Sequence, residues 1–382
     1  MKYNRKIIYL AGFLFSISIA LTSYINSSFL KEFVSEYYIG VAYIIASLIT
    51  ILGMLEIQKV LTRIGNRKTT LIFSFLSFLS LLLLAFTHNS FIAIVSFIIF
   101  FTTSNLIIAT LDMFVEDFSK NSSTGKLRGI YLTIINISWV IAQSISGSII
   151  TQSSYKGLYL FSALFMFLVC IIFIIKLHDF IDPKYTKIPV IKTVKSFIKN
   201  KNISKIYILS FILRFFFVWM IIYTPIYLHE YLGFGWEKIG LIFTIMLLPF
   251  VILTYPLGKL SDKIGEKKML IIGFLTISFF TLLIPFIKSS DFWIWAGILF
   301  ATRVGAATIE IMSESYFFKS VDKEDANIIG FFRNTSPLSF IIAPLVAIPI
   351  LFHTPSFSYI FYILGTLLLF GFFITLRLKD VK

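Results

Sequence analysis

Two arginines lie inside long apolar runs of the sequence, where a charged side chain is costly. Arg303 falls within IWAGILFATRVGAATI, and Arg214 falls within IYILSFILRFFFVWMIIY. A guanidinium stays charged at every relevant pH and presents a planar fork of donors that matches carboxylates and other anions. We expect no Asp or Glu at the same depth as Arg303. Unpaired arginines without a central carboxylate favour an anionic or zwitterionic ligand over a cation.

Each arginine also has a structural interpretation. Arg303 could pair with a backbone carbonyl or an acid, and the long side chain of Arg214 could extend to the nearer membrane surface. Polar and aromatic residues of other apolar runs could complete a binding site, although hydrogen bonds between helices are commoner for such groups. These candidates are Tyr24, Asn26, Asn105, Asn136, Gln143, Trp219 and Tyr223.

Catalytic and metal-binding constellations are not expected. The four histidines (His88, His178, His229 and His353) fall in loops or at the ends of apolar runs, and the single cysteine, Cys170, lies in an apolar run. No nucleophile and base are spaced to act together, and no metal-ligand pattern appears. We therefore expect neither enzymatic activity nor a cofactor or metal.

A short turn motif occurs twice, as RIGNRK from Arg63 to Lys68 and as KIGEKK from Lys263 to Lys268. Other pairs of segments keep nearly the same offset. These are Ile39-Gly40 with Ile239-Gly240, and Thr110-Leu111-Asp112 with Thr308-Ile309-Glu310, each of the latter followed by a second acid, Glu116 or Glu314. At the same offsets, Asn105 corresponds to Arg303 and Leu14 to Arg214. A chain built from two copies of one half is expected to place its working site between them.

The turns carry residues suited to gating. Gly258 would permit close approach of a neighbouring helix, Gly265 a tight reversal, and Asp262 could accept hydrogen bonds at a helix start. We hypothesise that Lys267, Lys268 and Arg333 pair with Glu310 and Glu314 when the cytoplasmic side is closed. The alternative is a proton relay through these glutamates. The first-half residues with the corresponding gating role are Arg63, Gly65, Arg67, Lys68, Asp112 and Glu116.

The elements that position these residues must be transmembrane helices, because 58% of the 382 residues are hydrophobic and only 14% are charged. Twelve spans of about 20 residues fit the length with short loops. They are expected near 7–30, 38–59, 69–87, 90–116, 129–151, 155–177, 205–228, 236–258, 268–287, 291–317, 327–351 and 356–376. This divides the chain into a six-helix half at 1–177, a basic linker at 178–204 and a second six-helix half at 205–382.

The net charge of +15 follows membrane topology rather than nucleic-acid binding. Most Lys and Arg residues fall on the side of the expected membrane that carries both termini and the linker. Four lie on the other side, Lys31, Lys156, Lys238 and Lys288, and three lie inside the spans. Because positive charge concentrates on the cytoplasmic side, we expect both termini in the cytoplasm and the protein in the cell inner membrane.

The segment GKLSDKIGEKKML resembles the signature loop between the second and third helices of each half in the major facilitator superfamily. Gly258, Asp262, Gly265, Lys267 and Lys268 all match that pattern. The first copy departs from it, with Gln58 at the family's Gly and Thr62 at its Asp. TRVGAA also resembles the family's arginine motif, although it falls at 291–317 rather than on the fourth helix. With twelve expected spans, the resemblance covers the whole chain.

The resemblance implies an all-α membrane protein in which two six-helix repeats rock about a central site. Its implied function is secondary active transport of a small organic solute, with proton coupling as a family-level expectation. Ala142-Gln143 stands where the family's exchangers often carry Gly-Pro, which weakens but does not remove the alternative of amphiphilic drug or metabolite efflux. A non-transporting membrane receptor or scaffold is a third alternative. As partners we expect the solute and the bilayer, no nucleic acid, and a monomeric chain.

Overall fold

The computed structural model describes residues 2–117, 124–176, 200–320, 332 and 334–379, and the regular elements within these ranges are helices. The first helices are α1 (Lys2–Ser23), α2 (Asn26–Lys31), α3 (Glu36–Ile64), α4 (Asn66–Phe86), α5 (Ser90–Asp117) and α6 (Thr124–Ile175). They are followed by α8 (Lys201–Ile226), the π-helical turn η1 (Tyr227–Tyr231), α9 (Trp236–Leu247), α10 (Pro249–Ile252), α11 (Thr254–Ile264), α12 (Glu266–Leu283), the 3₁₀ turn η2 (Ile284–Phe286), α13 (Phe292–Ser320), α15 (Thr335–His353) and α16 (Tyr359–Leu376).

The described helices account for the twelve expected spans. Ten are long and apolar enough to cross a membrane, and a bent pair formed by Trp236–Ile252 and Thr254–Ser261 makes an eleventh. One of the ten contains two spans, because its apolar part runs for 46 residues, more than twice the membrane thickness. Ser154 breaks it with φ 58° and ψ −173°, at the point where the sequence predicts a boundary between 129–151 and 155–177.

The expected first span is interrupted. Instead of one helix over 7–30, the chain turns at Tyr24 and Ile25 between α1 and α2. The hydroxyls of Thr22 and Ser23 both donate to the carbonyl oxygen of Ile19, and the amide of Ile25 donates to the carbonyl of Thr22. Local side-chain bonds of this kind compete with the helical pattern, so the helix ends here.

The eighth span is also broken, although the sequence predicts one helix over 236–258. Its two parts are bent by 40°, and the chain runs through the short helix α10 before α11 begins. Pro249 and Pro256 lack amide donors and oppose a continuous helix. The equivalent first-half positions are Ile49 and Glu56, and α3 is continuous there. The interruption is therefore a property of the second half alone.

The chain divides into two compact units. The first comprises Met1–Lys187 and Gly235–Leu241, and the second comprises Ile188–Phe234 and Ile242–Lys382. Most of the expected linker at 178–204 lies outside the described residues, and α8 begins at Lys201.

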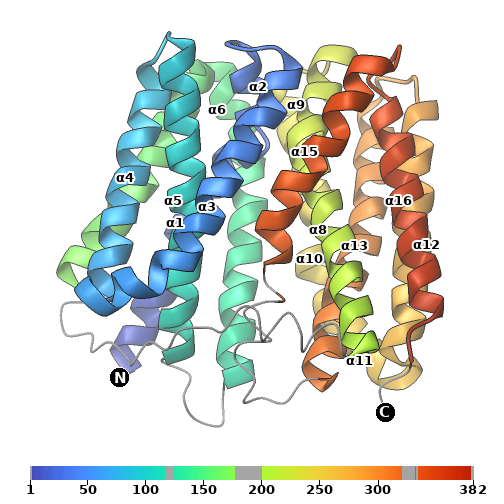
Figure 1. Cartoon of the computed structure of the whole chain (residues 1–382). Coiled ribbons are helices and arrows are strands. Elements are labelled where there is room, and N and C mark those ends of the chain that lie inside the picture. Colours follow the sequence, from blue (N-terminus) through green and yellow to red (C-terminus); the bar gives the residue numbers. More distant parts are fainter. Residues whose placement is uncertain (1, 118–123, 177–199, 321–331, 333, 380–382) are drawn as a thin grey trace. The chain divides into compact units, whose positions relative to one another are not determined.

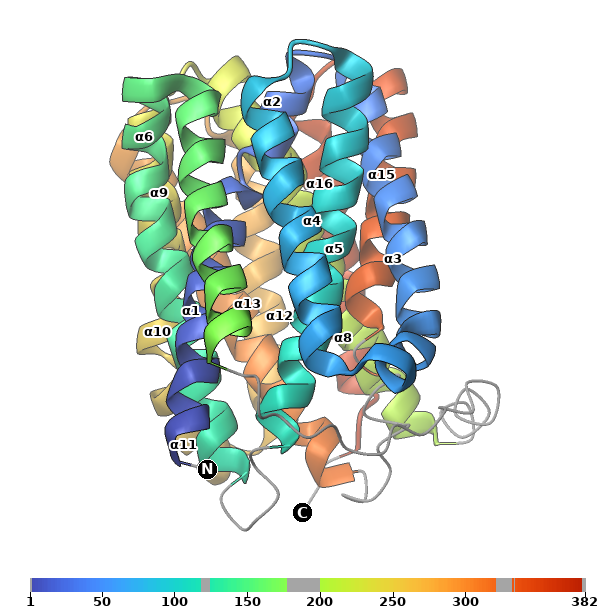
Figure 2. The same ribbon diagram turned by 90° about the vertical axis from the view of Figure 1, so that its left-hand side faces the viewer.

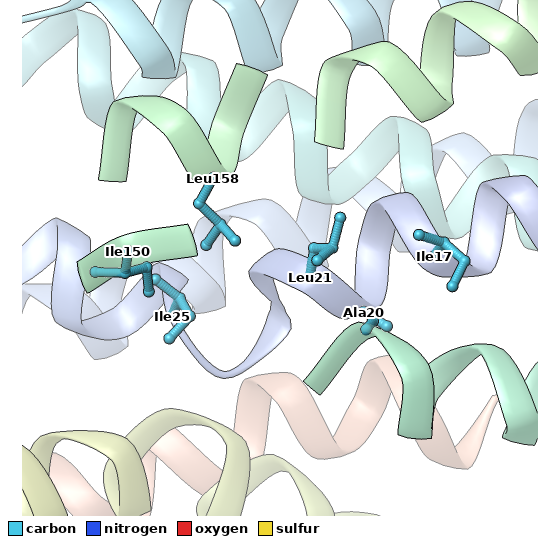
Figure 3. Packing of buried hydrophobic residues seen from close by; sticks show 7 residues of the cluster. Ile17, Ala20, Leu21, Ile25, Ile150 and Leu158 are labelled. Atoms are coloured by element: carbon cyan, nitrogen blue, oxygen red, sulfur yellow. The ribbon is translucent and has the colours of Figure 1, made fainter. Parts of the chain in front are cut away.

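Within each unit, neighbouring helices pack along their lengths. In the first unit α4 lies beside α5, and in the second unit α12 lies beside α13 and α16 (Figures 1 and 2). Part of the first unit's core is formed where α1 meets α6. Ile17, Ala20 and Leu21 of α1 and Ile25 of the following turn belong to one apolar cluster with Ile150 and Leu158 of α6 (Figure 3). These side chains are at most 6% exposed. In the second unit, the packing of helices against one another fixes the positions of charged side chains.

Candidate functional site

Arg303 lies on α13 and is only 1% exposed. Its guanidinium carbon is 4.7 Å from the ring centroid of Phe216 and 5.7 Å from that of Phe217, both on α8. A cation at this distance over an aromatic face is attracted to the ring, by about 2 kcal/mol or more when water is excluded. Aromatic contacts therefore hold this charge in the bundle and turn it toward α8.

Gly305 explains why Arg303 has this orientation. A side-chain carbon at Gly305 would lie 2.7 Å from the Ile277 nitrogen and 2.8 Å from the Gly273 carbonyl oxygen, so α13 contacts the backbone of α12 here. Two residues along a helix correspond to about 200° of rotation. The surface that contacts α12 therefore directs Arg303 to the opposite side of α13. Gly273 and Gly305 correspond to Phe73 and Ile107, so this close crossing is absent from the first-half sequence.

Arg214 forms a salt bridge with Glu310, with 2.9 Å between its Nη2 and the carboxylate Oε1. The expectation that Arg214 has no carboxylate partner is therefore wrong. Both helices are longer than predicted, since α8 begins at Lys201 and α13 ends at Ser320. Glu310 lies ten residues, about 15 Å, before the end of α13, within reach of the long Arg214 side chain on α8.

Phe217 connects the two arginines. Its ring centroid is 5.7 Å from the guanidinium carbon of Arg214 and 5.7 Å from that of Arg303. The same ring packs edge-on against Phe250 of α10, at 5.9 Å between centroids. The broken eighth span therefore supports the ring that both arginines contact. Interrupted helices beside charged groups are frequent at transporter binding sites.

Trp219 and Tyr223 belong to an aromatic row that the sequence analysis missed. The row repeats every fourth residue along α8 and η1, and its members are Phe211, Phe215, Trp219, Tyr223, Tyr227 and Tyr231. Ring centroids of Phe215 and Trp219 are 5.0 Å apart, and those of Trp219 and Tyr223 are 5.7 Å apart. Residues four apart are neighbours on a helix surface, so the spacing alone could have identified the row. With 44 phenylalanines in the chain, such a row is hard to distinguish from the general apolar pattern of the spans.

The first-unit candidates make contacts between or within helices. Gln143 donates from Nε2 to the carbonyl oxygen of Ala20 at 2.6 Å, which joins α6 to α1. Asn26 accepts from the hydroxyl of Tyr159 at 2.9 Å. Asn105 donates to the carbonyl of Phe101 in its own helix at 2.9 Å.

Two further first-unit candidates lie elsewhere. Tyr24 is in the turn before α2 and packs edge-on against Trp139 at 6.3 Å, and Asn136 is partly exposed on α6. Among the candidates of the second unit, a salt bridge and a shared aromatic ring join Arg214, Glu310, Phe217 and Arg303.

The two repeated turns have the same backbone shape. Gly65 has φ 82° and ψ 160°, and Gly265 has φ 85° and ψ 150°. This region of conformational space is essentially restricted to glycine. Each glycine ends one helix and precedes the next, so the reversal predicted at Gly265 is present in both halves. At Gly258 no described atom lies within 4 Å of an added side-chain carbon, so the expected close approach of a neighbouring helix stays a prediction.

The two turns differ at the residue that follows each glycine, Asn66 in the first and Glu266 in the second. The sequence alone did not indicate a role for either residue. Glu266 is 3% exposed and accepts from Lys319 and, at 2.9 Å, from the Ser315 hydroxyl, both on α13. Its counterpart Asn66 is 1% exposed and donates to the Thr110 carbonyl at 3.1 Å. The second turn therefore uses a buried carboxylate paired with a half-exposed lysine, where the first uses a neutral amide.

The remaining gating candidates are dispersed over the inner helix ends. Arg67 donates to the carbonyl oxygens of Phe173 and Ile174, at 2.8 Å each, and so caps α6. Lys267 and Lys268 have no salt bridge among the described side chains, while Glu310 is bonded to Arg214. Several of the other candidates are exposed or partly exposed: Arg63, Lys68, Asp112 and Glu314. Arg333 and the side chains of Glu116 and Asp262 lie outside the described parts of the chain.

Comparison with known proteins gives a consistent assignment. Two solved structures of the nucleoside transporter NupG, one of them a point mutant, each superpose with a TM-score of 0.76. They share 12% and 13% sequence identity with this chain and cover 98% of it, and the chain covers 98% and 99% of them. At this identity the likeness shows the fold alone. No curated protein matches the sequence. The model of the Major Facilitator Superfamily matches residues 8–238 and 207–382, and the chain belongs to this family of membrane transporters.

Proposed function

We propose that this protein is a secondary active transporter of a small organic solute that works by alternating access of its two six-helix halves. The observation that carries the proposal is the group of charged side chains within the spans of the second unit. Arg214, Glu310 and Arg303 are joined through a salt bridge and a shared aromatic ring. Charges in a transmembrane segment are costly and mark substrate or ion pathways.

The solute is expected to carry charge, either as an anion or as a zwitterion. Arg303 supports this expectation because it is a positive charge buried within the span of α13. Arg214 supports it because its positively charged side chain is partly exposed. NupG transports nucleosides, so its shared fold is also compatible with a solute that has a planar ring. The aromatic rings on α8 beside both arginines would suit such a group.

Glu310 is our candidate for coupling transport to protons. It is a carboxylate within a span, it is 26% exposed, and its partner Arg214 belongs to the same proposed site. A carboxylate that exchanges partners during transport can bind and release a proton. Proton-coupled uptake would be abolished by Glu310→Gln, whereas exchange of labelled for unlabelled solute would continue with a reduced solute affinity.

The repeated turns are proposed to form part of the inner gate. In the state closed to the cytoplasm, Lys267, Lys268 and Arg333 would approach Glu310 and Glu314. The test is a charge exchange: Lys268→Glu alone should impair transport, and Lys268→Glu combined with Glu314→Lys should restore it. Absence of rescue in the double variant would contradict this pairing.

The test of transport is uptake into proteoliposomes containing the purified protein, screened with radiolabelled organic anions, zwitterions and nucleosides. We expect saturable uptake of at least one solute above that of protein-free liposomes. Efflux of amphiphilic dyes, with no uptake of these solutes, would instead support the efflux alternative. Binding of a protein partner without any flux would support a receptor or scaffold.

A further inference from the structure

Arg214 and Arg303 differ in whether a solute can reach them. The side chain of Arg214 is 29% exposed and that of Glu310 is 26% exposed, whereas Arg303 is 1% exposed. Arg303 is covered by Phe216, so a solute entering this conformation would meet the Arg214–Glu310 salt bridge. Exposure therefore favours the ion pair as the contact site, although the sequence alone favours Arg303.

The side chain of Arg214 is partly exposed, and a charge within a span is expected to face water rather than lipid. Arg214 belongs to a partly exposed stripe of α8 with Phe211, Phe217 and Ile221, which are spaced along one face of the helix. A charge facing hydrocarbon costs roughly 2.5–3.5 kcal/mol, and such residues almost always face the bundle interior or a water-filled cavity. The apolar members of this stripe would then form the wall beside the charge pair.

Phe217 and Phe250 limit how far Arg214 can move. The Phe217 ring lies 5.7 Å from the guanidinium carbon and is itself packed against Phe250. The donor group is thus held in place while one of its partners, Glu310, is replaceable. A preorganised guanidinium loses little freedom when it changes its carboxylate partner.

We propose that this salt bridge is a recognition site for a zwitterionic solute that carries an ammonium and a carboxylate group a few bonds apart. The inference rests on the proposed transport function and narrows its solute class. The solute carboxylate would replace Glu310 at Arg214, and the solute ammonium would replace Arg214 at Glu310. Both protein charges stay paired in this exchange. A solute with a single charge would leave one of the two protein charges without a partner at a site that is less than one third exposed, which is unfavourable.

The test is thermal-shift binding to the purified full-length protein, using the twenty common amino acids as probes. Each is compared with its two single-charge analogues, the carboxylate without the amine and the amine without the carboxylate. We expect at least one amino acid to bind about tenfold or more tighter than both of its analogues, because each lost charged contact is worth more than a neutral hydrogen bond. If no amino acid exceeds its analogues, the inference is overturned.

Two variants test whether the salt bridge itself is responsible. Glu310→Gln should shift the preference toward the carboxylate analogue, and Arg214→Gln should shift it toward the amine analogue. Lys319→Gln, which breaks the ion pair with Glu266, should leave the preference unchanged. If Arg214→Gln and Glu310→Gln do not fold, the exchanged pair Arg214→Glu with Glu310→Arg retains both charges and should retain zwitterion preference. An unchanged preference in folded single variants would contradict the inference.

Solute counterflow in proteoliposomes separates this inference from the proposed function. Zwitterion binding without counterflow would contradict transport and leave the recognition site in place. Counterflow that does not favour zwitterions over their single-charge analogues would contradict the zwitterion site and leave transport in place.

Discussion

At the scale of single residues, Arg303 has two separable roles, as a packing element and as a charge. Its side chain is among the largest that are fully buried, and it fills the space next to Phe216. A buried charge can often be replaced by an apolar side chain of similar volume without loss of stability, whereas truncation leaves a cavity. Substitutions that keep or remove volume therefore distinguish the two roles.

We expect Arg303→Met to keep the melting temperature within a few degrees of the wild type while transport falls about tenfold or more. Arg303→Ala should lose transport and also about 2–5 kcal/mol of stability, the usual cost of large-to-small changes in a core. Thermal unfolding and proteoliposome uptake are the two measurements. Full transport by Arg303→Met would assign Arg303 a packing role alone.

The residue types of the site are readable from the sequence, but their partners are not. The sequence singles out both arginines and Glu310 because charges in apolar runs are conspicuous. It does not pair Arg214 with Glu310, since the two are 96 positions apart and their contact depends on how α8 meets α13. Trp219 and Gln143 are the opposite case. The sequence suggests both as site residues, whereas in the structure Trp219 is buried and Gln143 bonds to a neighbouring helix.

At the scale of elements, the glycine turns are the clearest case of sequence dictating backbone shape. Gly265 has φ 85° and no described atom within 4 Å of a side-chain carbon placed there. Any cost of a larger residue therefore comes from the backbone conformation and not from collision.

We expect Gly265→Ala to lower the free energy of unfolding by about 1–3 kcal/mol, because alanine must adopt a conformation that glycine alone tolerates. Gly258→Ala is the matched control in the preceding helix, where there is also space for the added carbon. It should be neutral or stabilising by up to about 1 kcal/mol, since alanine is the better helix former. Equal losses in both variants, measured by thermal or denaturant unfolding, would contradict the backbone explanation.

Gly305 illustrates the opposite cause, collision without an unusual backbone conformation. We expect Gly305→Ala to separate α13 from α12, to cost about 1–3 kcal/mol by overpacking and to displace Arg303 from Phe216. Gly297→Ala, earlier in the same helix and with nothing within 4 Å, should have no such effect. The readouts are thermal stability and solute affinity. Unchanged affinity in a folded Gly305→Ala protein would show that the crossing does not position Arg303.

At the scale of the whole molecule, the two halves share a repeat but differ in chemistry. The turns at Gly65 and Gly265 match in conformation, while Asn66 and Glu266 differ in charge. The second unit also has the broken span and the arginine site. A duplicated scaffold has therefore been specialised on one side, which is consistent with a solute site formed mainly by the second half.

Topology can be tested with a single introduced cysteine at either end of α12. Lys268 and Lys288 are both exposed; Lys268 lies in the first turn of the 18-residue helix α12, which is about 27 Å long, and Lys288 follows its other end. With both termini in the cytoplasm, Lys288→Cys should react with a membrane-impermeant maleimide in intact cells, and Lys268→Cys only after permeabilisation. Cys170 is 4% exposed and should contribute little labelling. The reverse pattern would invert the assigned orientation.

The sequence by itself determined the membrane class, the number of spans, the repeat and the glycine turns. Each of these depends on local quantities: apolar run length, charge placement, and a backbone conformation open to one residue type. Only the tertiary structure decided that Arg214 pairs with Glu310, that Phe217 contacts both arginines, and that Glu266 makes a close contact at its turn. These depend on helix crossings, in which small shifts along or around a helix axis change every neighbour.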